Sequence, residues 1–103
     1  MSDLNEIRDD TLKNHVNVFL SVVKENGLPF PVIDITEDEQ TVIAMWDKRN
    51  EALNFFFDKN GIMAIWCSIA DSPPICETTE YDINENYDEV LAYLKRKLVE
   101  MSF

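Results

Sequence analysis

The sequence predicts a two-layer α+β domain, in which one helix precedes and another follows a four-stranded antiparallel meander. Three observations carry this prediction: a helical period near each end of the chain, four short β-type runs between them, and an Asn-Gly pair at 60–61 joining two of the runs. The chain has 103 residues, of which 46% are hydrophobic. One domain spanning 1–103 with a buried core is therefore expected.

The first helix is expected over about 9–26. At about 100° per residue its apolar side chains form one broad stripe, made of Leu12, Val16, Phe19, Leu20 and Val23. Asp9 or Asp10 suits the N-cap, and Gly27 suits the left-handed position after the last turn. The "LPFP" that follows forces an extended exit, because proline cannot continue a helix.

The second helix is expected to begin after Asn86, with Glu89 as its capping-box partner. Its apolar stripe consists of Tyr87, Val90, Leu91, Leu94, Leu98 and Met101. The cations at 95–97 lie in its last turns, where they favour the helix dipole.

The four strands are expected at 32–36, 41–47, 52–58 and 62–70, with turns at 37–40, 48–51 and 59–61. These spacings are too short for helical crossovers, so the sheet should be antiparallel. The acidic segment 71–86 is expected to be irregular, because Pro73 and Pro74 stop the sheet, with at most a short edge strand in "ICETT".

Alternation along the hairpins predicts two apolar faces on this sheet. One face should carry Val42, Ala44, Trp46, Leu53, Phe55, Phe57, Ile62, Ala64 and Trp66. The other should carry Ile43, Met45, Phe56, Met63, Ile65 and Cys67. A sheet with one wet side would alternate cleanly between apolar and polar residues, so the second face needs a cover.

Three arrangements that would bury the second face agree with the sequence. One helix could lie on each face, the acidic segment could fold over the second face, or another chain could cover it. We favour both helices on one face, which leaves the other for intermolecular contact, since large exposed apolar patches usually mark such contacts.

The charge balance limits the classes of partner that the protein can bind. Asp and Glu number 20 against 9 Lys and Arg, for a net charge of -11. This balance disfavours direct binding to nucleic acid or to an acidic membrane surface, since both need clustered cations. It favours a basic protein as the partner, and a second copy of the chain in a homodimer is the other candidate. The N-terminus lacks the pattern of a signal peptide and no run is long enough to span a membrane, so a cytoplasmic protein is expected.

Catalytic and cofactor motifs do not emerge from the residue pattern, so we predict a protein that is not an enzyme and binds no cofactor or metal. His15 is the only histidine, and a packing role suits it better than catalysis. Cys67 suits a small buried apolar residue, and Cys76 lies nine residues on, outside any CxxC spacing. A disulfide between them is judged improbable in a reducing compartment.

The acidic residues gather in two places. No Lys or Arg occurs from 60 to 94, and a second acidic group surrounds the first turn. We predict that these regions hold the partner-binding residues, with a tyrosine as an apolar anchor: Asp34, Glu37, Asp38, Glu39, Asp71, Glu77, Glu80, Tyr81, Asp82 and Glu85. A merely solubilising surface is the competing interpretation.

The predicted function is an acidic protein-binding module that neutralises or inhibits a basic toxin, nuclease or nucleic-acid-binding protein. Immunity proteins and phage-encoded inhibitors of host defence share this physical profile, which is an analogy of physics and not of motif. Two alternatives remain: a DNA mimic whose carboxylates imitate phosphates, and a subunit that self-associates through its sheet.

Overall fold

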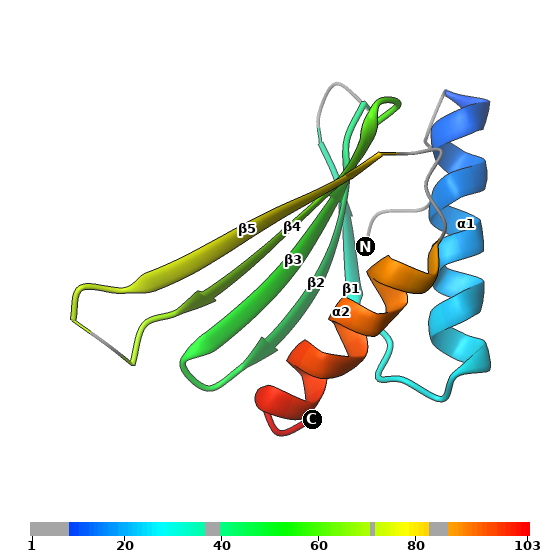
Figure 1. The fold of residues 1–103 in the computed structure, drawn as a ribbon. Coiled ribbons are helices and arrows are strands. Elements are labelled where there is room, and N and C mark those ends of the chain that lie inside the picture. The colour runs from blue at the N-terminus through cyan, green and yellow to red at the C-terminus, as the bar shows by residue number, and fades with distance from the viewer. Residues whose placement is uncertain (1–8, 37–39, 71, 83–86) are drawn as a thin grey trace.

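Two helices cover one face of a five-stranded antiparallel sheet (Figure 1). The computed structural model describes residues 9–36, 40–70, 72–82 and 87–103. The elements in chain order are α1 (Asp10–Glu25), β1 (Val32–Ile35), β2 (Val42–Lys48), β3 (Glu51–Phe57), β4 (Gly61–Ser68), β5 (Ile75–Asp82) and α2 (Tyr87–Glu100). The strands follow one another in the order β1-β2-β3-β4-β5, as a meander requires.

The helix boundaries of α1 follow from its caps. The Asp9 carboxylate accepts a hydrogen bond of 2.9 Å from the backbone N–H of Leu12, which satisfies one of the free donors at the helix start. Gly27 has φ +66°, the left-handed conformation expected after the last turn. Both features confirm the predicted ends, whereas the predicted cap of α2 at Asn86 lies outside the described residues.

The core lies between the helices and one face of the sheet. Phe19 of α1 packs against Phe55 and Phe57 of β3, with ring centroids 5.4 and 4.9 Å away. Val90, Leu94 and Leu98 extend this core along α2. The indole N–H of Trp46 donates to the carbonyl of Pro29 at 2.8 Å, which holds the chain after α1 against the sheet.

The hairpin registers confirm the predicted alternation. Phe57 pairs with Ile62 and Lys48 pairs with Glu51, so a four-residue and a two-residue turn join these strands. Asp58 shapes the longer turn, because one carboxylate oxygen accepts from the N–H groups of Asn60 and Gly61. Both helices share one face, as predicted, and the structure shows that it is the face carrying Phe55 and Phe57, a choice the sequence had left open.

A fifth strand corrects the predicted count of four. β5 covers half of the segment expected to be irregular and pairs with the whole of β4. The carboxylates of this segment make it resemble a loop, yet acidic side chains also suit an edge strand, where they stay in water and deter unwanted pairing. Thr78, Thr79 and Tyr81 also favour extended backbone.

The register also joins the two cysteines. Cys67 of β4 lies opposite Cys76 of β5, and the two form a disulfide. This bond corrects the expectation from the sequence, in which a reducing compartment disfavoured a disulfide. The pairing of β4 with β5, which brings the two sulfur atoms together, was not predicted.

Candidate protein-binding surface

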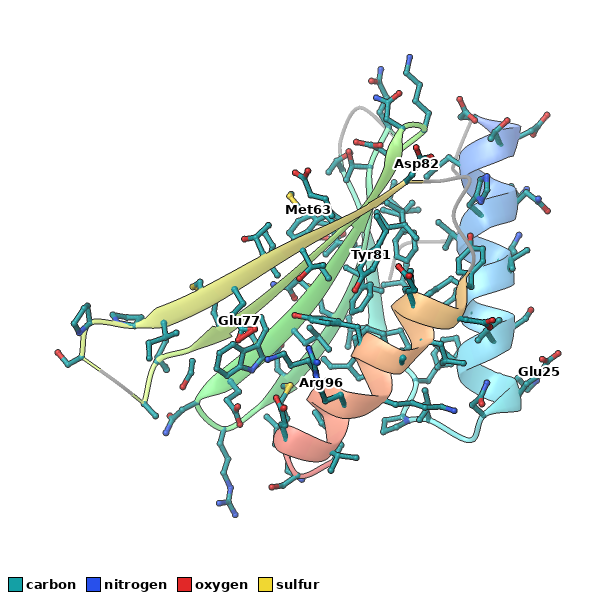
Figure 2. All side chains as sticks on the ribbon, in the orientation of Figure 1. Glu25, Met63, Glu77, Tyr81, Asp82 and Arg96 are labelled. Atoms are coloured by element: carbon teal, nitrogen blue, oxygen red, sulfur yellow. A yellow bond between two sulfur atoms is a disulfide. The ribbon has the colours of Figure 1, made fainter. Side chains whose placement is uncertain are left out.

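The sheet face opposite the helices has no layer over it within the described residues (Figure 1). We call it the bare face. Figure 2 shows Met63 on this side of the sheet and Tyr81 on the side of the helices. Its three central strands contribute Ile43, Met45, Ala52, Asn54, Phe56, Met63, Ile65 and Cys67, all of them half-buried.

The end of the bare face nearest the β3–β4 turn is apolar in the middle and acidic at both edges, whereas the next row carries Val32 and Thr78 on its edge strands. The pairing Asp34–Ile43–Phe56–Met63–Glu80 forms one row across all five strands. In this row a carboxylate on each edge strand flanks three apolar side chains. Asp82 extends the acidic border along β5, opposite Gly61. A surface of this kind suits a partner that is both apolar and cationic.

A hollow deepens the bare face beside the β3–β4 turn. It has a volume of about 620 Å³, and its lining includes Phe56, Met63, Asp58, Glu80 and Asp82. The aromatic ring and the thioether can contact the aliphatic stem of a Lys or Arg side chain, while the carboxylates bind its cationic head. The turn also carries the exposed cation Lys59, which the three carboxylates outnumber.

Asn54 interrupts the apolar centre of the bare face. It lies between Met45 and Ile65 in the pairing register. Its side-chain oxygen is buried and has no hydrogen-bond partner among the described residues. This acceptor costs stability, because burial removes its water without replacing the hydrogen bond.

The predicted binding residues divide between the two faces. Asp34, Glu80 and Asp82 come together around the bare face. Glu77 and Tyr81 lie on the other side of β5, toward α2 (Figure 2). The remaining members of the predicted set lie outside the described residues: Glu37, Asp38, Glu39, Asp71 and Glu85.

Glu77 is occupied by an ion pair inside the protein. Lys97 of α2 is only 4% exposed, and its ammonium lies 3.2 Å from Glu77 and 3.3 Å from Glu100. The same ammonium lies 4.3 Å from the ring centroid of Trp66. Burial lowers the pKa of Lys97, but the hydrogen bonds and charges of the two carboxylates outweigh it and raise the pKa above the usual value.

Tyr81 packs within the protein and points away from the bare face. It is half-buried against the core, and its ring lies 6.4 Å from that of Tyr93. Burial raises the pKa of Tyr93, although the charge of Lys97 opposes the shift. Tyr81 nevertheless contributes to the lining of the hollow beside the β3–β4 turn, together with Glu80 and Asp82, so it lies next to these carboxylates although its ring packs toward the helices.

His15 joins the two helices. Its Nδ1 lies 3.0 Å from the hydroxyl of Tyr87, and that hydroxyl donates to the His15 carbonyl at 3.1 Å. With its hydroxyl proton committed to the carbonyl, Tyr87 accepts from Nδ1–H. This bond fixes α2 against α1, which agrees with the packing role predicted for His15.

The described part of the chain contains no free thiol and no metal-ligand cluster. Both cysteines are in the disulfide, and no cluster of three or more His, Cys, Asp or Glu side chains has the geometry to hold a metal ion within residues 9–36, 40–70, 72–82 and 87–103. The described helices include none that is both long and apolar enough to cross a bilayer. The bare face is the feature best suited to recognition.

Comparison of the chain with protein-family models, with curated proteins and with solved structures finds no match.

Proposed function

We propose that this chain is a small acidic protein-binding module that occupies a basic site on another protein and thereby neutralises or inhibits it, as immunity proteins and phage-encoded inhibitors do. One observation carries the proposal: the apolar bare face has carboxylates on both of its edges, at Asp34 and at Glu80. Burial of the apolar centre supplies affinity, and the acidic border selects a cationic partner.

The net charge of -11 supports this choice of partner. It attracts a basic protein over a distance of about 8–10 Å at ordinary salt and so speeds the encounter. It also acts against a second copy as the occupant of the bare face, since stacking two such faces brings the acidic borders of both copies together. The apolar centre nevertheless supports self-association as a second candidate.

A DNA mimic receives less support. That function needs carboxylates in regular rows at the spacing of phosphates. In the row from Asp34 to Glu80, three apolar side chains separate the two carboxylates. The arrangement suits a mixed apolar and cationic partner better than a protein that reads phosphate charge alone.

The cytoplasm is the compartment we propose, as the composition indicates. Glutathione and thioredoxin keep most thiols there reduced, so the Cys67–Cys76 bond would be exposed to reduction. The pairing of β4 with β5 involves eight residues of each strand and extends well beyond the disulfide. Binding in this proposal therefore depends on the paired strands rather than on the bond.

The experiment begins with capture from a lysate of the source organism, followed by identification of the captured protein, its purification and reconstitution of the pair. We expect a basic protein whose own activity falls stoichiometrically when the chain is added. The double variant Asp34→Asn/Glu80→Gln should weaken inhibition about tenfold, or about 1.4 kcal/mol.

The matched control is Glu25→Gln/Glu89→Gln, which removes two charges from exposed helix positions. Figure 2 shows Glu25 on the outer side of α1, away from the bare face. The control should inhibit as the wild type does. Equal loss of inhibition in both double variants would mean that the acidic border acts only through net charge. A purified partner whose activity the chain never lowers would overturn the proposal. Concentration-dependent self-association in light scattering would favour the second candidate.

A further inference from the structure

We propose that the bare face binds a basic amphipathic α-helix of the partner protein, with the apolar strip of the helix along β3 and its Lys or Arg side chains on both flanks. This inference rests on the proposed function and names the form of the partner. Three features support it: the width of the apolar centre, the position of the carboxylates and the helical layer on the opposite face.

The apolar centre has the width of one helix. It spans β2, β3 and β4, with Ile43, Phe56 and Met63 in one row. Neighbouring strands lie about 4.8 Å apart, so β2 and β4 are separated by about 10 Å. An α-helix with its side chains is about 10–12 Å across. A single helix along β3 therefore covers this strip, whereas two helices side by side would extend over the acidic edges.

The carboxylates lie where the flanks of such a helix would be. Asp34 is on one edge strand, and Glu80 and Asp82 are on the other. Lys and Arg next to an apolar stripe extend their aliphatic stems outward along the surface and keep their charges at the border. The hollow lined by Phe56, Met63 and Glu80 provides one place for such a side chain.

A helix covers more of this surface than the other polypeptide occupants. An extended strand added to the outer edge of β5 would satisfy backbone groups there but leave the apolar centre in water. A second copy would place acidic borders together. A basic helix covers the centre and matches both borders, and it would complete on this face the layer that α1 and α2 form on the other (Figure 1).

The test uses a synthetic peptide of about 14 residues, close to four helical turns, made of Leu, Ala and Lys with the apolar residues on one face. A second peptide has the same composition in an order that breaks the helical period. We expect the amphipathic peptide to gain helical circular dichroism on binding and to bind at least about tenfold more tightly than the scrambled one. Amide shifts in ¹H–¹⁵N spectra should centre on β2, β3 and β4.

Two chain variants locate the contact. Ile65→Lys places a cation at the centre of the bare face and should weaken binding of the amphipathic peptide at least about tenfold. Val99→Lys makes a similar exchange on α2, where the side chain is 76% exposed, and should bind as the wild type does. Unchanged dispersion of the ¹H–¹⁵N spectrum checks that each variant folds. The double variant Asp34→Asn/Glu80→Gln tests the two border charges and leaves the apolar centre intact.

Equal affinity for both peptides would mean that binding depends on peptide charge alone, which would overturn the inference. Shifts confined to β5 would show strand addition instead, and an unaffected Ile65→Lys variant would place the contact elsewhere. The proposed function can stand when this inference fails, because inhibition of a reconstituted basic partner through another surface would still support it. Conversely, if the peptide binds but no partner is inhibited, the docking site would be supported and the proposed function would be overturned.

Discussion

Lys97 is the residue whose environment departs most from its sequence expectation. Its position favours the helix dipole, yet it is buried between two carboxylates and the Trp66 ring. The signal was in the spacing: Val90, Leu94, Lys97 and Met101 follow one another at helical intervals on the buried side. Its charge obscured that pattern, because Lys is rarely buried unless it is paired.

Lys97→Met should lower the free energy of unfolding by about 1–2 kcal/mol, because it removes the contact of the ammonium with Trp66 and the ion pairs with half-exposed carboxylates. Urea unfolding followed by circular dichroism measures the change. Lys95→Met, an exposed position of the same helix, should stay within about 0.5 kcal/mol of the wild type. Equal effects would show that the ammonium of Lys97 adds nothing to stability.

The tyrosines predict how stability depends on alkaline pH. Burial raises the pKa of both Tyr87 and Tyr93 above 10.0. A raised pKa in the folded state means that the neutral phenol is favoured in the folded protein. The resulting stabilisation is complete when the pH is below the pKa of the unfolded state, and it is lost as the pH rises through the pKa of the folded state. The raised pKa of Lys97 acts in the same direction.

Absorbance at 295 nm should therefore show at least two of the three tyrosines ionising above pH 10, together with unfolding. Tyr93→Phe should remove one of the late-ionising groups while leaving the protein folded at neutral pH. A single titration of all tyrosines at their ordinary pKa, with the fold retained, would contradict the burial of both rings.

Among the elements, the sequence predicted the helices and hairpins well because their signals are local. Asp9, Gly27 and the turn at 58–61 act on the residues next to them. β5 was harder, since a polar edge strand resembles a loop until its partner is known. The disulfide depended on the same missing pairing of β4 with β5.

Two neighbouring phenylalanines on β3 test the one-sided cover of the sheet. Phe55 is fully buried beneath the helices, whereas Phe56 lies on the bare face. Phe55→Ala should cost about 3–5 kcal/mol because it leaves a cavity in the core. Phe56→Ala should cost about 1 kcal/mol, because only its neighbours within the sheet lose contact. Chemical denaturation of both variants measures the difference, and similar costs would mean that the bare face is covered in solution.

For the whole molecule, charge dominates the expected behaviour. Repulsion among the carboxylates opposes the compact state at a net charge of -11. Raising sodium chloride from about 0.02 to 0.5 M shortens the screening length to a few ångströms. We expect the thermal midpoint to rise by about 2–5 °C, which corresponds to less than about 1 kcal/mol. A fall in the midpoint would mean that screened ion pairs, such as Lys97–Glu77, outweigh the repulsion.

The site was less predictable than the fold. The acidic pattern selected Asp34, Glu80 and Asp82 as candidates, and the strand alternation predicted the apolar residues that lie between them on the bare face. It could not show that Glu77 pairs internally with Lys97, because that contact joins β5 to a helix that follows it in the chain. Parity within β5 would have placed Glu77 and Tyr81 on the opposite side, had the strand been recognised.

Both indoles of the protein lie on the helix side of the sheet. Trp46 is enclosed with Phe19 and Phe55, and Trp66 lies under the ammonium of Lys97. Intrinsic fluorescence will therefore report the departure of α2 sensitively, through loss of the cation above Trp66. It will respond weakly to a ligand on the far side of the sheet, so titrations of such a ligand need an extrinsic dye or a labelled peptide.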